Sequence, residues 1–261
     1  MVAWLGGGVL LLVAVLWVTG LLLANDFAVP SRAVDDLPRT MAVFPHPDDE
    51  TVSAGGTLSA IAEAGGSVTL VILTRGELGV SPSGVGGGLG RVREKEAARA
   101  AARLGIPVVV QGGFADGGLG SQRAEAAAWL ATEIARWRPD LVITYDLSGL
   151  YGHPDHIACA EIITQLRSSR FPELAVWHAC LPGRLVRTLA RLGTLQADFP
   201  EASRRARPTL KVFVGGRLLA KARAWREYAS QRGSVGGWGG RLVPAWIFLT
   251  VQPFEYFEAA G

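Results

Sequence analysis

The sequence predicts an α/β fold with a Rossmann-like, mostly parallel sheet and helices on both faces. Short apolar runs with the composition of strands alternate along the chain with Ala-rich segments of helical periodicity. Alternation of this kind is typical of a parallel sheet that helices cover on both sides. A charge-free apolar stretch at the N-terminus adds a predicted transmembrane helix.

Residues 1–25 form this predicted membrane anchor. The run from Val2 to Asn25 carries no charged side chain and is long enough to cross a hydrocarbon core of about 30 Å. A cleavable signal peptide is the alternative, but the run has no basic residue at its start and no convincing small-residue cleavage site. The flanking charges are mixed, so they do not predict an orientation.

Residues 26–39 are predicted to be a linker, and residues 40–261 a single domain. We expect strands at 41–44, 68–73, 108–111 and 141–145, and helices at 51–64, 91–104 and 121–137. Gly105 and Pro139 mark the ends of the last two helices. Ligands of such sheets bind outside the carboxyl ends of the strands.

The charge pattern argues against a nucleic-acid partner, since the net charge is only +3. Basic residues are concentrated between Arg184 and Arg226. Arg184, Arg187 and Arg191 fall at helical spacing between leucines, which predicts an amphipathic helix. Such a helix could lie against anionic lipid headgroups, but an ordinary solvated helix face is the favoured interpretation.

Two short segments carry the chemistry, and the first is FPHPDDE at residues 44–50. If a helix begins near Pro47, His46 and Asp49 can face one point at the strand–helix junction. Asp48 then points elsewhere and can take a proton from a metal-activated water. Taken alone, the segment is better explained as an acidic helix N-terminus.

The second segment is YGHPDH at residues 151–156, and the two segments hold three of the four histidines in the chain. Catalytic zinc usually has three protein ligands and an open position. His46, Asp49 and either His153 or His156 supply that number. The other histidine is free to act as an acid or to stabilise an oxyanion, with Asp155 fixing its tautomer. Fe²⁺ can occupy the same kind of site.

Several ordered segments resemble the LmbE-like (PIG-L) zinc de-N-acetylase family, from about residue 40 to at least residue 231. The matching segments are PHPDDE at 45–50, GGT at 55–57, LTRGE at 73–77, an R-x-x-E helix from 93, F-x-D-G-x-L at 114–119, YGHPDH at 151–156 and Lys221 followed by SQ at 230–231. The resemblance implies that His46, Asp49 and His156 hold Zn²⁺ and that Asp48 is the general base.

The same resemblance implies roles for the remaining candidate residues. His153, oriented by Asp155, would stabilise the oxyanion or protonate the leaving amine. Tyr151 would help to polarise the acetamide carbonyl. Arg75 and Asp116 would line the sugar pocket.

The expected function is therefore zinc-dependent removal of an acetyl group from an N-acetylglucosamine-type moiety of a glycolipid or glycoconjugate. The expected partners are an N-acetylated amino sugar, lipid-linked or free, and membrane lipids. The excess of Arg over Lys, with abundant Ala and Gly, is typical of a bacterial chain, so a bacterial cell membrane is the expected location. The alternatives are a metal hydrolase of another amide or ester, and a non-catalytic glycan- or lipid-binding module on the same fold.

Overall fold

The computed structural model describes residues 2–37, 39–79, 88–191, 205–231 and 251–260. Within these ranges the chain forms one seven-stranded sheet in the order β3-β2-β1-β4-β5-β7-β6. The strands are β1 (Arg39–Phe44), β2 (Ser67–Thr74), β3 (Val108–Phe114), β4 (Leu141–Tyr145), β5 (Ala175–Ala179), β6 (Leu210–Phe213) and β7 (Phe254–Ala260).

The first five strands are parallel, as the sequence predicted, because each runs back to the sheet through a helical connection. At the other edge, β7 pairs antiparallel with both β5 and β6. This antiparallel edge was not predicted. The sheet is therefore mixed, with its parallel part confirmed.

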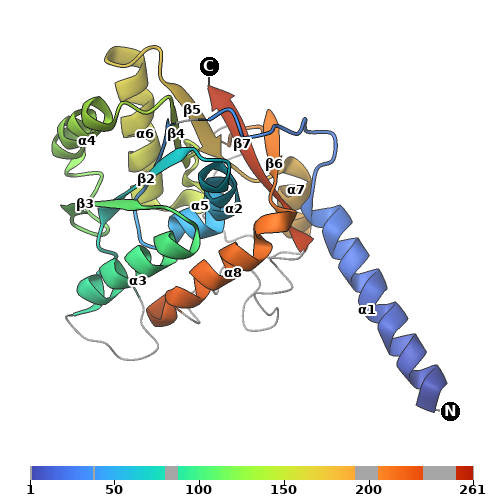
Figure 1. Ribbon diagram of the computed structural model, residues 1–261. Coiled ribbons are helices and arrows are strands. Elements are labelled where there is room, and N and C mark those ends of the chain that lie inside the picture. The colour runs from blue at the N-terminus through green and yellow to red at the C-terminus, as the bar shows by residue number, and fades with distance from the viewer. Residues whose placement is uncertain (1, 38, 80–87, 192–204, 232–250, 261) are drawn as a thin grey trace.

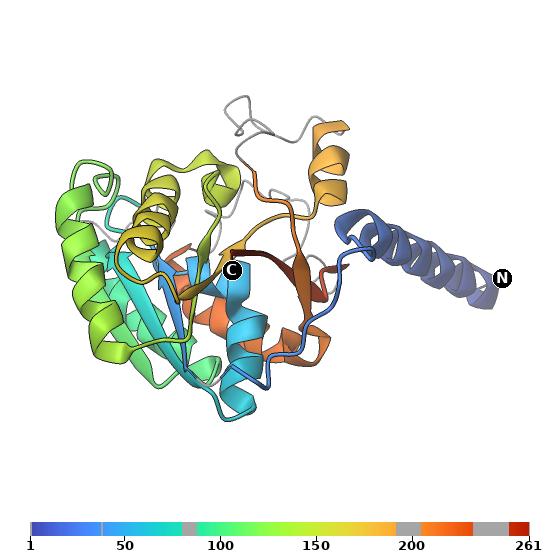
Figure 2. The same cartoon turned by 90° about the horizontal axis from the view of Figure 1, so that it is seen from above.

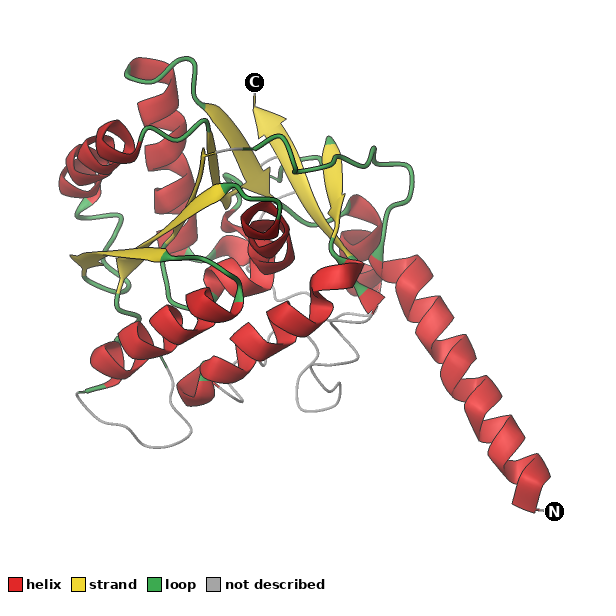
Figure 3. Ribbon diagram, in the orientation of Figure 1, coloured by secondary structure: helices red, strands yellow, loops and turns green. Residues whose placement is uncertain are grey.

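The helices cover both faces of the sheet (Figures 1 and 3). They are α1 (Val2–Ala24), α2 (Asp49–Glu63), α3 (Leu89–Arg103), α4 (Arg123–Trp137), α5 (Gly149–Gly152), α6 (Pro154–Ser169), α7 (Gly183–Arg191) and α8 (Leu218–Glu227), with the 3-10 turns η2 (Gly215–Arg217) and η3 (Ala229–Gln231). Side chains of α2, α3 and α8 form one apolar core with the sheet, and those of α4 and α6 form a second. The two-sided α/β prediction is confirmed.

The N-terminal helix α1 extends away from the sheet (Figure 2). Across the part of the chain that the structure describes, no helix combines the length and the apolar character needed to cross a membrane. The transmembrane anchor predicted for residues 1–25 is therefore not supported.

The segment predicted as a linker lies along the edge strand β6. The backbone amide of Arg32 donates to the Lys211 carbonyl at 2.9 Å, and the Lys211 amide donates to the Pro30 carbonyl at 2.8 Å. These bonds tie residues 30–32 to the sheet. Helix α7 forms where the arginine spacing predicted it, with Arg184, Arg187 and Arg191 exposed and Leu185 buried.

Candidate active site

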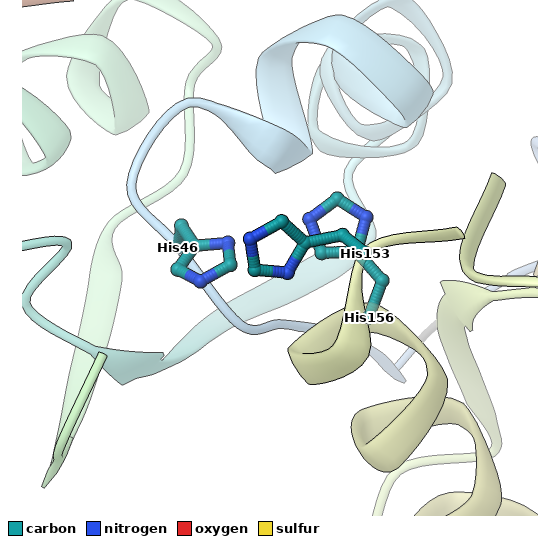
Figure 4. Close-up of side chains that lie close together, drawn as sticks. All are labelled: His46, His153 and His156. Atoms are coloured by element: carbon teal, nitrogen blue, oxygen red, sulfur yellow. The ribbon is translucent and has the colours of Figure 1, made fainter. Parts of the chain in front are cut away.

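The candidate site lies where β1 and β4 end side by side. The connections run in opposite directions from these two neighbouring strands, and such a switch point is where open α/β sheets bind their ligands. His46 follows β1, while His153 and His156 lie at the start of α6 after β4 (Figure 4). One ring nitrogen from each lies within 4.8 Å of the other two. The predicted meeting of the two His/Asp segments is confirmed.

The turn after β1 is held in an unusual conformation. Asp48 has a φ of 102°, which is uncommon and costly for a residue other than glycine. The carbonyl of Pro45 accepts from the Thr74 amide at 2.9 Å and from its hydroxyl at 3.0 Å. These contacts fix the start of the turn against β2. The turn directs Asp48 and Asp49, although adjacent in sequence, toward different partners.

Asp49 lies between two imidazoles. Its Oδ2 is 3.2 Å from His46 Nδ1, and its Oδ1 is 3.4 Å from His156 Nε2. Burial alone would raise the pKa of Asp49, but the adjacent His156 and His46 outweigh burial and lower it. For His156 burial is the larger effect. It lowers the pKa of the imidazole to about 3, so the neutral ring is favoured. A carboxylate between two histidines is a suitable donor set for a divalent cation.

One buried atom supports this fit. His156 is fully buried, and its Nε2 makes no hydrogen bond with any residue that the structure describes. The other ring nitrogen, Nδ1, lies 3.2 Å from the Gly149 carbonyl oxygen, which orients the ring. Buried polar atoms are normally satisfied, so a neutral Nε2 directed at Asp49 is consistent with a metal ligand.

His46 is held from its other side by two further carboxylates. Its Nε2 lies 3.1 Å from Asp116 Oδ1 and 3.2 Å from Asp155 Oδ2. The Asp155 carboxylate also accepts the amides of Gly117 at 2.7 Å and Leu119 at 3.1 Å. Burial would lower the pKa of His46, yet the three surrounding carboxylates raise it well above its usual value. Carboxylates in this position fix the tautomer of a ligating histidine.

This arrangement differs from the predicted role of Asp155 as the partner that orients His153. The Asp155 carboxylate faces His46 because the loop amides of residues 117 and 119 hold it there. The link to His153 is made by the backbone instead, since the Asp155 amide donates to His153 Nδ1 at 3.2 Å. This hydrogen bond caps the start of α6, with Pro154 at the first helical position.

Asp48 is separated from its neighbours by its contact with α3. Arg93 Nη2 lies 3.2 Å from Asp48 Oδ2 and donates to the Pro47 carbonyl at 2.5 Å. Burial raises the pKa of Asp48 to about 8, the Arg93 charge opposes this, and the nearby Asp49 and Glu50 carboxylates add to it. A carboxyl with a raised pKa beside a candidate metal site is typical of a catalytic acid or base.

Glu50 braces the same turn from within the core. Its Oε2 accepts the Asp48 amide at 3.1 Å, and its Oε1 accepts the Tyr228 hydroxyl at 2.7 Å and the Thr51 hydroxyl. Burial raises the pKa of Glu50. These bonds connect the strained turn to the segment that follows α8.

Tyr151 and Arg75 lie farther out. Tyr151 is 40% exposed, and its ring centroid lies 6.3 Å from that of His153 and 4.9 Å from that of His156. Tyr151 therefore lies at the mouth of the site. Arg75 donates to Glu94 at 2.6 Å and its side chain is 55% exposed. Asp116, the other predicted sugar contact, lies against His46, with 3.1 Å between Asp116 Oδ1 and His46 Nε2.

Two residues at the site were not predicted to act there. Tyr145, expected only as part of a strand, donates its hydroxyl to Asp49 Oδ1 at 2.9 Å. Arg93 was noted only within the family-like helix, yet it contacts Asp48. A tyrosine at the carboxyl end of a predicted strand, a few residues before the second segment, was the available signal for Tyr145.

Comparison with known proteins supports a family assignment. Residues 41–167 match the family model described as PIG-L: GlcNAc-PI de-N-acetylase. A 1D-myo-inositol 2-acetamido-2-deoxy-alpha-D-glucopyranoside deacetylase from Actinosynnema mirum is 32% identical over 263 residues, covering 86% of this chain and 92% of the relative. A protein of the same name from Nakamurella multipartita is 36% identical over 197 residues, but the match covers 64% of each chain.

A solved structure shares the fold. The N,N'-diacetylchitobiose deacetylase from Pyrococcus horikoshii superposes with a TM-score of 0.61 at 22% identity, over 87% of this chain and 85% of that one. The sequence matches extend over most of the domain and include both His/Asp segments. The chain therefore belongs to the PIG-L (LmbE-like) de-N-acetylase family.

Proposed function

We propose that this protein is a zinc-dependent hydrolase that removes the acetyl group from an N-acetylglucosamine-type moiety. The observation that carries the proposal is the position of Asp49 between His46 and His156. The neighbouring Asp48 carboxylate contacts Arg93 and not these histidines. Family membership supports the same reaction, because the relatives are named as deacetylases of a 2-acetamido-2-deoxyglucoside.

His46, Asp49 and His156 would hold the ion. Bound there, a divalent cation would polarise the acetamide carbonyl and lower the pKa of a water molecule. His153 is a geometric alternative to Asp49, since its ring lies within the same group of imidazoles. Asp49 is the preferred third ligand, because its carboxylate faces both His46 and His156 and its lowered pKa keeps it ionised.

Asp48 would remove the proton from the attacking water. Its carboxylate is adjacent to the ligand Asp49, yet Arg93 keeps it on a different side of the turn. Such a separation lets one carboxylate bind the ion while the other remains free to accept a proton. Asp48 would then carry that proton toward the leaving amine.

His153 and Tyr151 would act on the carbonyl side of the substrate. His153 Nδ1 accepts a backbone amide, so the neutral ring carries its proton on Nε2. Nε2–H is thus available as a donor to the developing oxyanion or to the leaving nitrogen. Tyr151, at the mouth of the site, supplies a second hydroxyl donor.

The proposed substrate class is a 2-acetamido-2-deoxyglucoside with a polyol, sugar or lipid attached to it. The glycolipid form at a bacterial cell membrane is the version predicted from the sequence. Acetate release from a soluble inositol N-acetylglucosaminide, from N,N'-diacetylchitobiose and from a lipid-linked N-acetylglucosaminide, each with and without chelator, tests the proposal. No metal-dependent release from any of them would contradict it.

A further inference from the structure

Tyr145 ends strand β4 on the buried side of the candidate metal site. Its side chain is only 1% exposed. The hydroxyl donates to Asp49 Oδ1 at 2.9 Å and accepts from Ser53 Oγ at 3.1 Å. Because Ser53 supplies a proton to the phenol oxygen, the proton of Tyr145 itself is directed at Asp49. The three residues form a chain of hydrogen bonds that ends on a proposed ligand.

The ring of Tyr145 holds a second proposed ligand. It stacks on the His156 imidazole with centroids 4.2 Å apart and planes within 10° of parallel. On another side it meets Phe44 edge-on, with centroids 5.0 Å apart. Phe44 and Tyr145 are the terminal residues of β1 and β4, so the sheet itself fixes the ring. One rigid side chain therefore contacts both Asp49 and His156.

We infer that Tyr145 is a positioning residue of the metal site, whose hydroxyl fixes the Asp49 carboxylate while its ring fixes the His156 imidazole. The inference rests on the proposed function, since it takes Asp49 and His156 as ligands. Asp49 Oδ2 is held by the His46 amide at 2.9 Å, so the two carboxylate oxygens have one fixed donor each. Without the Tyr145 donor, the carboxylate can rotate about its side-chain bond.

Two substitutions separate the hydroxyl from the ring. Tyr145→Phe keeps the stacking on His156 and the contact with Phe44, but removes the donor to Asp49. Loss of a hydrogen bond to a metal ligand typically costs about 10- to 100-fold in metal affinity, and we expect a loss of that size. Ser53→Ala removes only the hydrogen bond that Tyr145 accepts. We expect it to weaken metal binding in the same direction but by less.

The matched control is Tyr228→Phe. Tyr228 is also fully buried, and its hydroxyl donates to the Glu50 carboxylate at 2.7 Å, but Glu50 is not a proposed ligand. Zinc affinity of the full chain is measured by competition with a chromophoric chelator, and the cobalt-loaded chain is examined by absorption spectroscopy. In the absence of metal, both tyrosine variants should melt at a lower temperature than the parent chain. Only Tyr145→Phe should also lose zinc affinity and shift the cobalt bands.

The outcomes distinguish this inference from the proposed function. A parent chain that binds zinc, together with a Tyr145→Phe variant of unchanged affinity and cobalt spectrum, would overturn the positioning role and leave the metal site intact. A parent that binds neither zinc nor cobalt would overturn both. If Tyr145→Phe does not fold, Ser53→Ala decides the matter, and unchanged zinc affinity in that variant would overturn the inference.

Discussion

Arg93 of α3 holds the Asp48 carboxylate, with 3.2 Å between Nη2 and Oδ2. The same guanidinium donates to the carbonyls of Pro47 at 2.5 Å and Gly76 at 2.8 Å. A single buried side chain thus connects the strained turn after β1 with the loop after β2. These contacts hold the turn in which Asp48 has a positive φ, and they give the Asp48 carboxylate a different partner from that of Asp49.

Replacing Arg93 by Lys should therefore misplace the proposed base. Lysine keeps the charge but cannot bond three acceptors in a fixed plane. We expect kcat for acetate release to fall by up to about 100-fold with a smaller change in KM, and stability to fall by about 1–3 kcal/mol. Steady-state kinetics and urea unfolding measure these effects.

The control for this substitution is Arg99→Lys on the same helix. Arg99 pairs with Glu227 at 3.0 Å and its side chain is 53% exposed. An exposed pair of this kind contributes little, so activity and stability should match those of the parent. An Arg93→Lys enzyme as active as Arg99→Lys would show that Asp48 does not depend on Arg93.

The two histidines of the second segment should separate by metal content. His156→Gln removes a proposed ligand, and we expect zinc affinity to fall by more than about 100-fold. Removing a residue that only hydrogen-bonds a metal ligand typically costs less than this. His153→Gln should keep zinc near the parental content but lose acetate release. Metal analysis after dialysis, with kinetics on the same samples, gives both readouts. The reverse pattern would make His153 the ligand.

Gly149 is required by the close approach of α6. Its φ is +64°, and an added Cβ would lie 2.8 Å from Ile157 Cγ1 and 3.0 Å from His156 Cβ. Gly149→Ala should lose stability by more than the roughly 1 kcal/mol expected for a left-handed alanine, and should also weaken zinc binding by displacing His156.

Gly113→Ala is the control for that variant. Gly113 also has a positive φ of +75°, but an added Cβ would meet nothing within 4 Å. It should show only the backbone cost of about 1 kcal/mol, with zinc affinity unchanged. Equal stability losses and equal zinc affinities in the two variants would contradict the proposed displacement of His156.

A buried ion pair joins α8 to strand β7 at the antiparallel edge of the sheet, and both of its members bind the backbone of α2. Lys221 Nζ lies 2.6 Å from Glu255 Oε1 and donates to the Val52 carbonyl at 2.9 Å. The Glu255 carboxylate accepts the amides of Gly56 and Thr57 at 2.9 and 2.8 Å. Val52 and Gly56 would pair with each other in a regular helix. The two side chains of the ion pair therefore stabilise α2 by binding backbone groups in the middle of the helix.

Removing one charge should be more harmful than removing both. Lys221→Met leaves Glu255 buried without its cation, and we expect a loss of about 3–5 kcal/mol in the free energy of unfolding. The double variant Lys221→Met with Glu255→Gln should recover part of that loss. Guanidinium unfolding of the three chains measures the effect, and a double variant less stable than Lys221→Met would contradict it.

Much of the fold was predictable because its signals are local. The apolar runs at 41–44, 68–73, 108–111 and 141–145 all became parallel strands. Strand β7 was missed because its glutamates resemble a polar segment. Glu255 is in fact buried, where the charge of the distant Lys221 and the backbone amides of Gly56 and Thr57 stabilise its carboxylate.

The site was predictable to a similar degree. The carboxyl ends of parallel strands meet at one edge, so His46 could be expected near His153 and His156. The sequence could not show which carboxylates would reach His46, because Asp116 and Asp155 approach it from a loop and a helix positioned by the tertiary fold. For the same reason the contacts of Tyr145 and Arg93 were not foreseen.

The central claim is a metal-held active site with Asp48 as its base, and Asp48→Asn tests it most directly. The substitution keeps the size of the side chain, and Asn tolerates a positive φ. Zinc content and acetate release from a 2-acetamido-2-deoxyglucoside would be measured for the parent and the variant. We expect equal zinc in both and a loss of about 10²- to 10⁴-fold in kcat for the variant. Full activity in Asp48→Asn with zinc bound would contradict the account.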